Sequence, residues 1–139
     1  MLQKFNYSIR KRELGISKAY LADIGFAKIG ENSKDIGRKI ENIVFLELVK
    51  GDKDEQELFY WKNQQQEEVD FVVKENNAVK ELIQVCYDIK DNETKKRETR
   101  ALLKAGKELK CKNLKIITWD YEGNEGGIHF IPLWKYLSK

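Results

Sequence analysis

The order of apolar and polar positions predicts two amphipathic helices separated by strands. Over residues 34–50, apolar side chains recur every three or four positions, which is the spacing of one helix face. The stripe consists of Ile36, Ile40, Ile43, Val44 and Leu48. Ser33 is suited to begin this helix as its N-cap, and Gly51 is suited to end it.

Three segments with strand spacing follow this helix, at residues 57–63, 68–74 and 79–89. The turn ENNA at 75–78 contains asparagines that tolerate positive φ, so it predicts a hairpin between the last two strands. Residues 91–110 form the second predicted helix, with Asp91 as its cap. Its inward face consists of Leu102, Ala105 and Leu109.

The remaining pattern completes an α/β fold with a mixed sheet covered by helices. Further strands are predicted at 18–26, 113–120 and 128–132, with a turn at 121–127 and a short helix at 133–139. A meander followed by a helical crossover to a new strand gives a sheet of mixed direction. The 139 residues fit one domain, which we assign to residues 16–139. Residues 1–15 are a tail or a remnant of an upstream region.

Composition restricts the class of protein. Hydrophobic residues make up 41% of the chain, which is enough to build a core and argues against disorder. No apolar run is long enough to span a bilayer, and the N-terminus lacks the pattern of a signal peptide. The two cysteines, Cys86 and Cys111, have no metal-binding spacing, which predicts a reduced, cytoplasmic setting.

Charge is unevenly distributed along the chain. Residues 51–88 carry four basic and ten acidic side chains, whereas residues 89–115 carry ten basic and four acidic. Residues 1–18 add five basic side chains and one acidic. This distribution predicts metal-binding carboxylates beside phosphate-binding cations, or alternatively a solvated surface of mixed charge.

Two polar residues interrupt the apolar pattern of the hairpin. Strand alternation predicts that Val69, Phe71 and Val73 share a core face, while Asp70 and Gln84 lie on the other face. An ionised aspartate in an apolar setting needs a cation, backbone donors or a metal ion. Glu41 or Glu47 of the first helix could reach Asp70, and a Glu, an Asp and a Gln together suit Mg²⁺. The alternative is an aspartate that faces water at a sheet edge.

The segments GRKIENIVFLEL, EVDFVV and ELIQVCYDI, in this order, resemble the PD-(D/E)XK nuclease superfamily. More narrowly, the chain looks like the domain of unknown function C-terminal to the ATPase module of archaeal and bacterial AAA-type ATPases. The likeness covers residues 18–123. It implies a restriction-endonuclease-like fold, an upstream ATPase module and a metal site formed by Glu41, Asp70 and Gln84. The chain itself has no G-x-x-x-x-G-K-[ST] motif, so it binds no nucleotide through a P-loop.

The chain departs from the superfamily pattern at the position of its lysine. That position is Cys86, whose neutral thiol cannot stabilise the charge that develops in phosphodiester cleavage. Lys96 or Arg100 of the second helix could supply a relocated cation. Gln84 also stands where a carboxylate would bind a metal more tightly. These changes predict a catalytically degenerate domain.

The second helix carries a basic stripe formed by Lys96, Arg100, Lys104 and Lys107. These side chains could neutralise nucleic-acid phosphates, or they could form a solvated helix face beside Glu93, Glu98 and Glu108. We therefore expect an accessory domain that binds DNA or another nucleic acid. The alternatives are an active Mg²⁺-dependent endonuclease that uses Lys96 or Arg100, and a protein-interaction or oligomerisation module.

Overall fold

The computed structural model describes residues 2–4, 33–50 and 56–138. The elements in chain order are β1 (Gln3–Lys4), α2 (Ser33–Lys50), β2 (Gln56–Lys62), β3 (Glu68–Glu75), β4 (Ala78–Val85), α3 (Asn92–Leu109), β5 (Leu114–Thr118), β6 (Gly123–Glu125), β7 (Ile128–Pro132) and α4 (Leu133–Leu137). The predicted strand at 18–26 and the predicted helix end at Gly51 lie outside the described residues.

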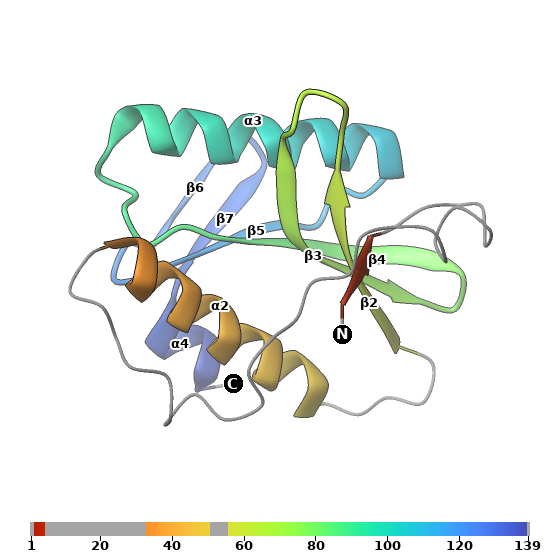
Figure 1. Cartoon of the computed structure of the whole chain (residues 1–139), viewed down its shortest axis with the longest axis horizontal. Coiled ribbons are helices and arrows are strands. Elements are labelled where there is room, and N and C mark those ends of the chain that lie inside the picture. The colour runs from red at the N-terminus through yellow and green to blue at the C-terminus, as the bar shows by residue number, and fades with distance from the viewer. Residues whose placement is uncertain (1, 5–32, 51–55, 139) are drawn as a thin grey trace.

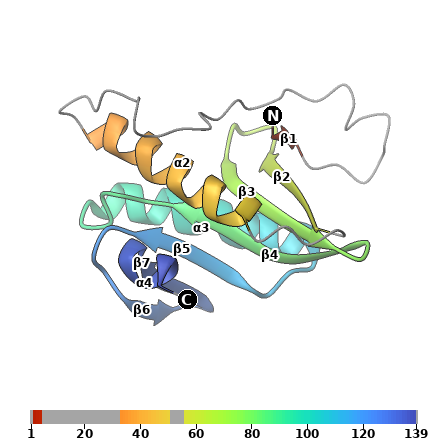
Figure 2. The ribbon, with the colours of Figure 1, turned by 90° about the horizontal axis from the view of Figure 1, so that it is seen from below.

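The described strands form one sheet of mixed direction, in the order β1-β2-β3-β4-β5-β7-β6. The strands β2, β3 and β4 run antiparallel to one another, and β4, β5 and β7 run parallel. Helix α3 covers one face of the sheet, whereas α2 and α4 lie on the other (Figure 1). Figure 2 shows the same layers from below. The predicted α/β fold with a mixed sheet between helices is confirmed.

Both faces of the sheet are buried in a core. The core beneath α3 includes Leu82, Leu102 and Ile116, and the core beneath α2 and α4 includes Val44, Ile83 and Tyr136. Strands that are covered on both sides carry continuous apolar runs, as β3 does from Phe71 to Val73. No helix among the described residues is long and apolar enough to cross a membrane.

A β-bulge in β3 overturns one sequence-based expectation. Between the pairs Phe59/Val72 and Trp61/Val69, one residue of β2 opposes two residues of β3. The extra residue reverses the alternation of side chains along the strand. Val69 therefore lies in the core beneath α3, while Phe71 lies in the core beneath α2. The prediction that these two side chains share a face was wrong.

The local signals in the sequence are otherwise followed closely. Ile40, Val44 and Leu48 of the predicted α2 stripe are buried. The hairpin turn contains Asn76 and Asn77 with φ of 52° and 65°, as its composition predicts. The largest differences are that β4 ends at Val85 rather than at 89, that β5 is shorter than the predicted 113–120, and that the predicted turn at 121–127 contains the short strand β6.

The strand β1 falls within the predicted tail. Gln3 and Lys4 pair with Phe59 and Tyr60 of β2 in parallel, and Leu2 is buried in the core beneath α2. The start of the chain thus contributes both backbone pairing and apolar contact to the sheet.

Candidate functional site

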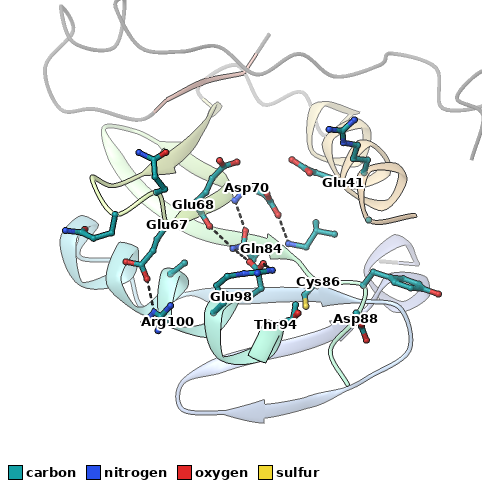
Figure 3. A pocket seen from close by; sticks show the side chains of 18 residues that line it. Glu41, Glu67, Glu68, Asp70, Gln84, Cys86, Asp88, Thr94, Glu98 and Arg100 are labelled. Carbon is teal, nitrogen blue, oxygen red and sulfur yellow. Dashed lines mark hydrogen bonds and ion pairs between the residues drawn. The ribbon is translucent and has the colours of Figure 1, made fainter. Parts of the chain in front are cut away.

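A cleft of about 710 Å³ lies between α2, α3 and the ends of β3 and β4. Its walls come from four segments that are distant in sequence, as Figure 3 shows. The lining residues are Gly37, Arg38, Glu41, Gln65, Gln66, Glu67, Glu68, Asp70, Gln84, Val85, Cys86, Tyr87, Asp88, Thr94, Arg97, Glu98, Arg100 and Ala101. The cleft thus contains Glu41, Asp70 and Gln84, the three residues that the resemblance places at a metal site.

The cleft opens where β3 and β4 separate. The ladder between these strands ends at the pair Phe71/Ile83, and beyond it β4 continues its pairing with β5. Separation of two strands leaves backbone donors and acceptors without their ladder partners, and each buried unpaired group is costly. Polar side chains are therefore required at this point.

Asp70 and Gln84 supply the missing partners. The Asp70 N–H donates to Gln84 Oε1 at 2.8 Å, and the Val85 N–H donates to Asp70 Oδ2 at 2.8 Å. The Gln84 Nε2 donates to the Glu68 carbonyl oxygen at 2.7 Å. We call these three hydrogen bonds the Asp70–Gln84 bracket (dashed in Figure 3). The bracket joins the two strands across the gap where their backbones no longer meet.

Gln84 also connects the sheet to α3. Its side chain is 1% exposed, and its Nε2 donates a second hydrogen bond, to the Glu98 carboxylate. The amide of a glutamine offers two N–H donors and one carbonyl acceptor, and here all three take part in hydrogen bonds. The carbonyl oxygen predicted to ligate a metal thus accepts a backbone hydrogen bond instead.

Glu98 is a half-buried carboxyl group next to this amide. Burial raises the pKa of Glu98 above its ordinary value of 4.5, while the Arg97 guanidinium at 3.4 Å opposes the rise. The nearby charge of Glu68 acts in the same direction as burial. Glu98 therefore retains its proton to higher pH than an exposed glutamate does.

Glu67, at the other end of the cleft, has a lowered pKa, whereas that of Glu98 is raised. Its carboxylate accepts hydrogen bonds from Lys104 Nζ at 2.6 Å and from Arg100 Nε at 2.9 Å. Lys104 first, with Asn63 and Arg100, lowers the pKa of Glu67 to about 2. Arg100 and Lys104, two members of the predicted basic stripe, thus form ion pairs with a carboxylate of the same chain.

The structure separates the members of the basic stripe. Arg100 lines the cleft, whereas Lys96, Lys104 and Lys107 are not among its lining residues. Lys107 instead lines a separate hollow near the C-terminal end of α3. The sequence pattern did not single out Arg38 and Arg97, which do line the cleft.

The predicted Mg²⁺ ligands Glu41, Asp70 and Gln84 share a cleft, and two of them take part in the bracket. Glu41 points from α2 toward Asp70 (Figure 3). Among the described residues, however, no group of three or more His, Cys, Asp or Glu side chains is placed to hold a metal ion. One Asp70 oxygen and the Gln84 carbonyl already accept hydrogen bonds in the bracket. The magnesium site formed by Glu41, Asp70 and Gln84 therefore stays a prediction.

Cys86 occupies the superfamily lysine position and is inert. Its side chain is 3% exposed and belongs to the core beneath α3. Burial first, and then the charges of Glu98 and Asp88, raise the pKa of Cys86 to about 12. At neutral pH this group is a neutral thiol, so it supplies neither a cation nor a nucleophile.

The family of the chain follows from comparison with known sequences. Residues 36–136, which include every residue lining the cleft, match the family described as Domain of unknown function (DUF4143). The chain belongs to the DUF4143 family.

A relative of this DUF4143 domain occurs in Methanocaldococcus jannaschii, under the name Uncharacterized protein MJ1544. The two are 42% identical over an alignment of 143 positions, which covers 94% of this chain. The chain spans 31% of the length of that relative. No solved structure matches the chain.

The bracket predicts a large difference between two glutamines of the DUF4143 domain. Gln84→Leu removes the side-chain partner of the Asp70 N–H and of the Glu68 carbonyl at a buried position, so we expect a loss of about 2–5 kcal/mol in unfolding free energy. Gln65→Leu changes an exposed residue of the same cleft and should alter stability by less than about 0.5 kcal/mol. Urea denaturation measures both. Similar losses in the two variants would contradict the bracket.

The raised pKa of Glu98 predicts a defined pH dependence. The folded chain binds the Glu98 proton more tightly than the unfolded chain does. This difference stabilises the folded state fully below pH 4.5, and the stabilisation is lost as the pH rises through the folded pKa. Glu98→Gln keeps an acceptor for Gln84 and cannot ionise. The difference in unfolding free energy, wild type minus Glu98→Gln, should therefore decrease as the pH rises from acidic to neutral. A constant or rising difference in denaturant titrations would refute this assignment.

Proposed function

We propose that this DUF4143 domain is a nuclease-like domain that binds nucleic acid without cleaving it. The elements α2, β2, β3, β4, α3 and β5 follow one another as in the superfamily that the sequence resembles, with a mixed sheet between the helices. The residues matching its site, Glu41, Asp70 and Gln84, line one cleft. Shared fold alone does not imply shared chemistry, so the proposal depends on the cleft.

The observation that supports the loss of catalysis is the use of the Gln84 amide in three hydrogen bonds within the domain. A two-metal or one-metal hydrolase needs oxygen ligands that are available to the ion. In this domain the Gln84 oxygen and one Asp70 oxygen complete the backbone pairing of separated strands. A metal at these oxygens would have to share them with those N–H donors, and Cys86 adds no cation that could stabilise the charge of a transition state.

The cations that remain in the cleft suit binding rather than hydrolysis. The lining contains Arg38 from α2, and it contains no lysine. It also contains Arg97 and Arg100 from α3, each of which pairs with a carboxylate through one guanidinium nitrogen and has further N–H groups. Guanidinium groups remain charged at every working pH and bind phosphate oxygens in a bidentate manner. Arginines on two walls of one cleft therefore support contacts with the phosphates of a nucleic-acid strand.

We further infer that the domain serves an AAA-type ATPase as its C-terminal accessory module. The resemblance noted in the sequence supports this assignment, and the chain spans 31% of its archaeal relative, which leaves room for another module in that protein. In such an arrangement the DUF4143 domain holds the nucleic acid while the ATPase supplies the conformational work.

Binding through the cleft predicts a change in salt dependence. For the double variant Arg38→Ala/Arg100→Ala, the slope of log affinity for DNA against log salt should decrease by about 1–2. Lys112→Ala removes an exposed cation outside the cleft lining and should leave that slope unchanged. Fluorescence anisotropy over a series of salt concentrations measures all three proteins. Equal slopes in all of them, or no binding at low salt, would refute the proposal.

The loss of catalysis predicts that plasmid DNA remains intact. Wild type and Asp70→Ala should both fail to nick supercoiled plasmid in the presence of Mg²⁺ or Mn²⁺, because the bracket engages the Gln84 oxygen and one Asp70 oxygen and Cys86 supplies no cation. Gel electrophoresis distinguishes nicked from supercoiled DNA. Nicking by the wild type that disappears in Asp70→Ala would establish the alternative, an active endonuclease with Arg100 as the relocated cation.

A further inference from the structure

We propose that Tyr87 and Trp119 form a stacking platform for an unpaired base, so that the cleft prefers single-stranded nucleic acid. This inference rests on the proposed function and specifies its substrate class. It is carried by the Tyr87 ring that lines the cleft, by the Trp119 ring in contact with it, and by the chemical character of the cleft lining.

The two rings meet because their strands are parallel neighbours. Tyr87 follows the end of β4, and Trp119 follows the end of β5, so both lie at the same edge of the sheet. Their ring centroids are 6.2 Å apart with an interplanar angle of 59°. Tyr87 also lines the cleft, and it therefore connects the Trp119 ring to the cleft interior.

Packing in the core does not account for the position of the Trp119 side chain. Its side chain is 53% exposed, and it belongs to neither buried cluster, in contrast to Trp61, which is 4% exposed beneath α3. An indole that faces water beside a cleft offers a broad apolar surface. Bases of any sequence stack on such surfaces because each base has two π faces.

The polar groups of the cleft also favour a base over a duplex. Three arginines and six carboxylates line the cleft. The carboxylates are those of Glu41, Glu67, Glu68, Asp70, Asp88 and Glu98. Carboxylates repel phosphates but accept hydrogen bonds from the N–H groups on base edges. In a duplex those edges are paired and the phosphates face outward. An unpaired strand can place its bases against the carboxylates and aromatic rings while its phosphates contact the arginines.

The test compares strand forms and two exposed tryptophans. Labelled single-stranded DNA, single-stranded RNA and duplex DNA are titrated against wild type, Trp119→Leu and Trp134→Leu by fluorescence anisotropy. Trp134 is the matched control, because it is 64% exposed on α4 and does not line the cleft. We expect tighter binding of the single strands than of the duplex. Trp119→Leu should weaken single-strand binding about tenfold and leave duplex binding nearly unchanged, whereas Trp134→Leu should match wild type.

A second readout keeps Trp119 intact. In the variant Trp134→Phe, the remaining indoles are the buried Trp61 and the exposed Trp119. Stacking of a base on Trp119 should quench the fluorescence of this variant as single-stranded oligonucleotide is added. The DNA and RNA arms distinguish the two sources of an unpaired base, and either one that meets these expectations supports the proposal.

The outcomes separate the inference from the proposed function. If single strands and duplex bind equally, and Trp119→Leu changes neither, the stacking platform is refuted while nucleic-acid binding stands. Unquenched fluorescence in Trp134→Phe at saturating single strand refutes the platform as well. If no form of nucleic acid binds at low salt, the proposed function itself is refuted, and the platform with it.

Discussion

The separation of β3 from β4 is the constraint on which the site depends. Strand β4 pairs with β5 along its second half, and its ladder with β3 ends at Phe71 and Ile83. A buried backbone group without a partner costs about 1–3 kcal/mol, so the gap requires substitutes for the lost ladder bonds. Gln84 and Asp70 are those substitutes, and through Glu98 they also join the sheet to α3.

The same constraint links structure to function. In the nuclease superfamily that the sequence resembles, polar groups at this separation serve chemistry, and here they complete the backbone pairing. From the amino-acid sequence alone, Asp70 and Gln84 are therefore compatible with both a structural and a catalytic role. What distinguishes the two is where each oxygen and nitrogen atom of the amide is directed, and all three polar interactions of Gln84 are internal to the domain. The cleft that remains is lined by arginines, carboxylates and an aromatic ring, which suit recognition.

Much of the fold could be predicted because its signals are local. The α2 stripe, the asparagine turn and the inward face of α3 each depend on residues within a few positions of one another. The shared cleft of Glu41, Asp70 and Gln84 was predicted through the family resemblance. The face of Val69 could not be predicted, because it depends on a bulge in the register between β2 and β3.

The cations were the least predictable part of the site. Arg100 and Lys104 bind Glu67, which lies 33 and 37 residues away, and no periodicity within α3 reveals such a partner. Arg38 carried a usable signal, since it lies one helical turn before Glu41 and must share its side of α2. A search for cations at that spacing would have found it.

Amide hydrogen exchange at Asp70 tests the central claim most directly. Its N–H lies beyond the last ladder pair of β3 and β4 and donates to the buried Gln84 side chain. The account predicts that this amide exchanges as slowly as that of Phe71 within the ladder, and that it becomes fast in Gln84→Leu while the amides of α3 remain protected. Fast exchange at Asp70 in the wild type, as at the exposed Asn77 of the hairpin turn, would contradict it.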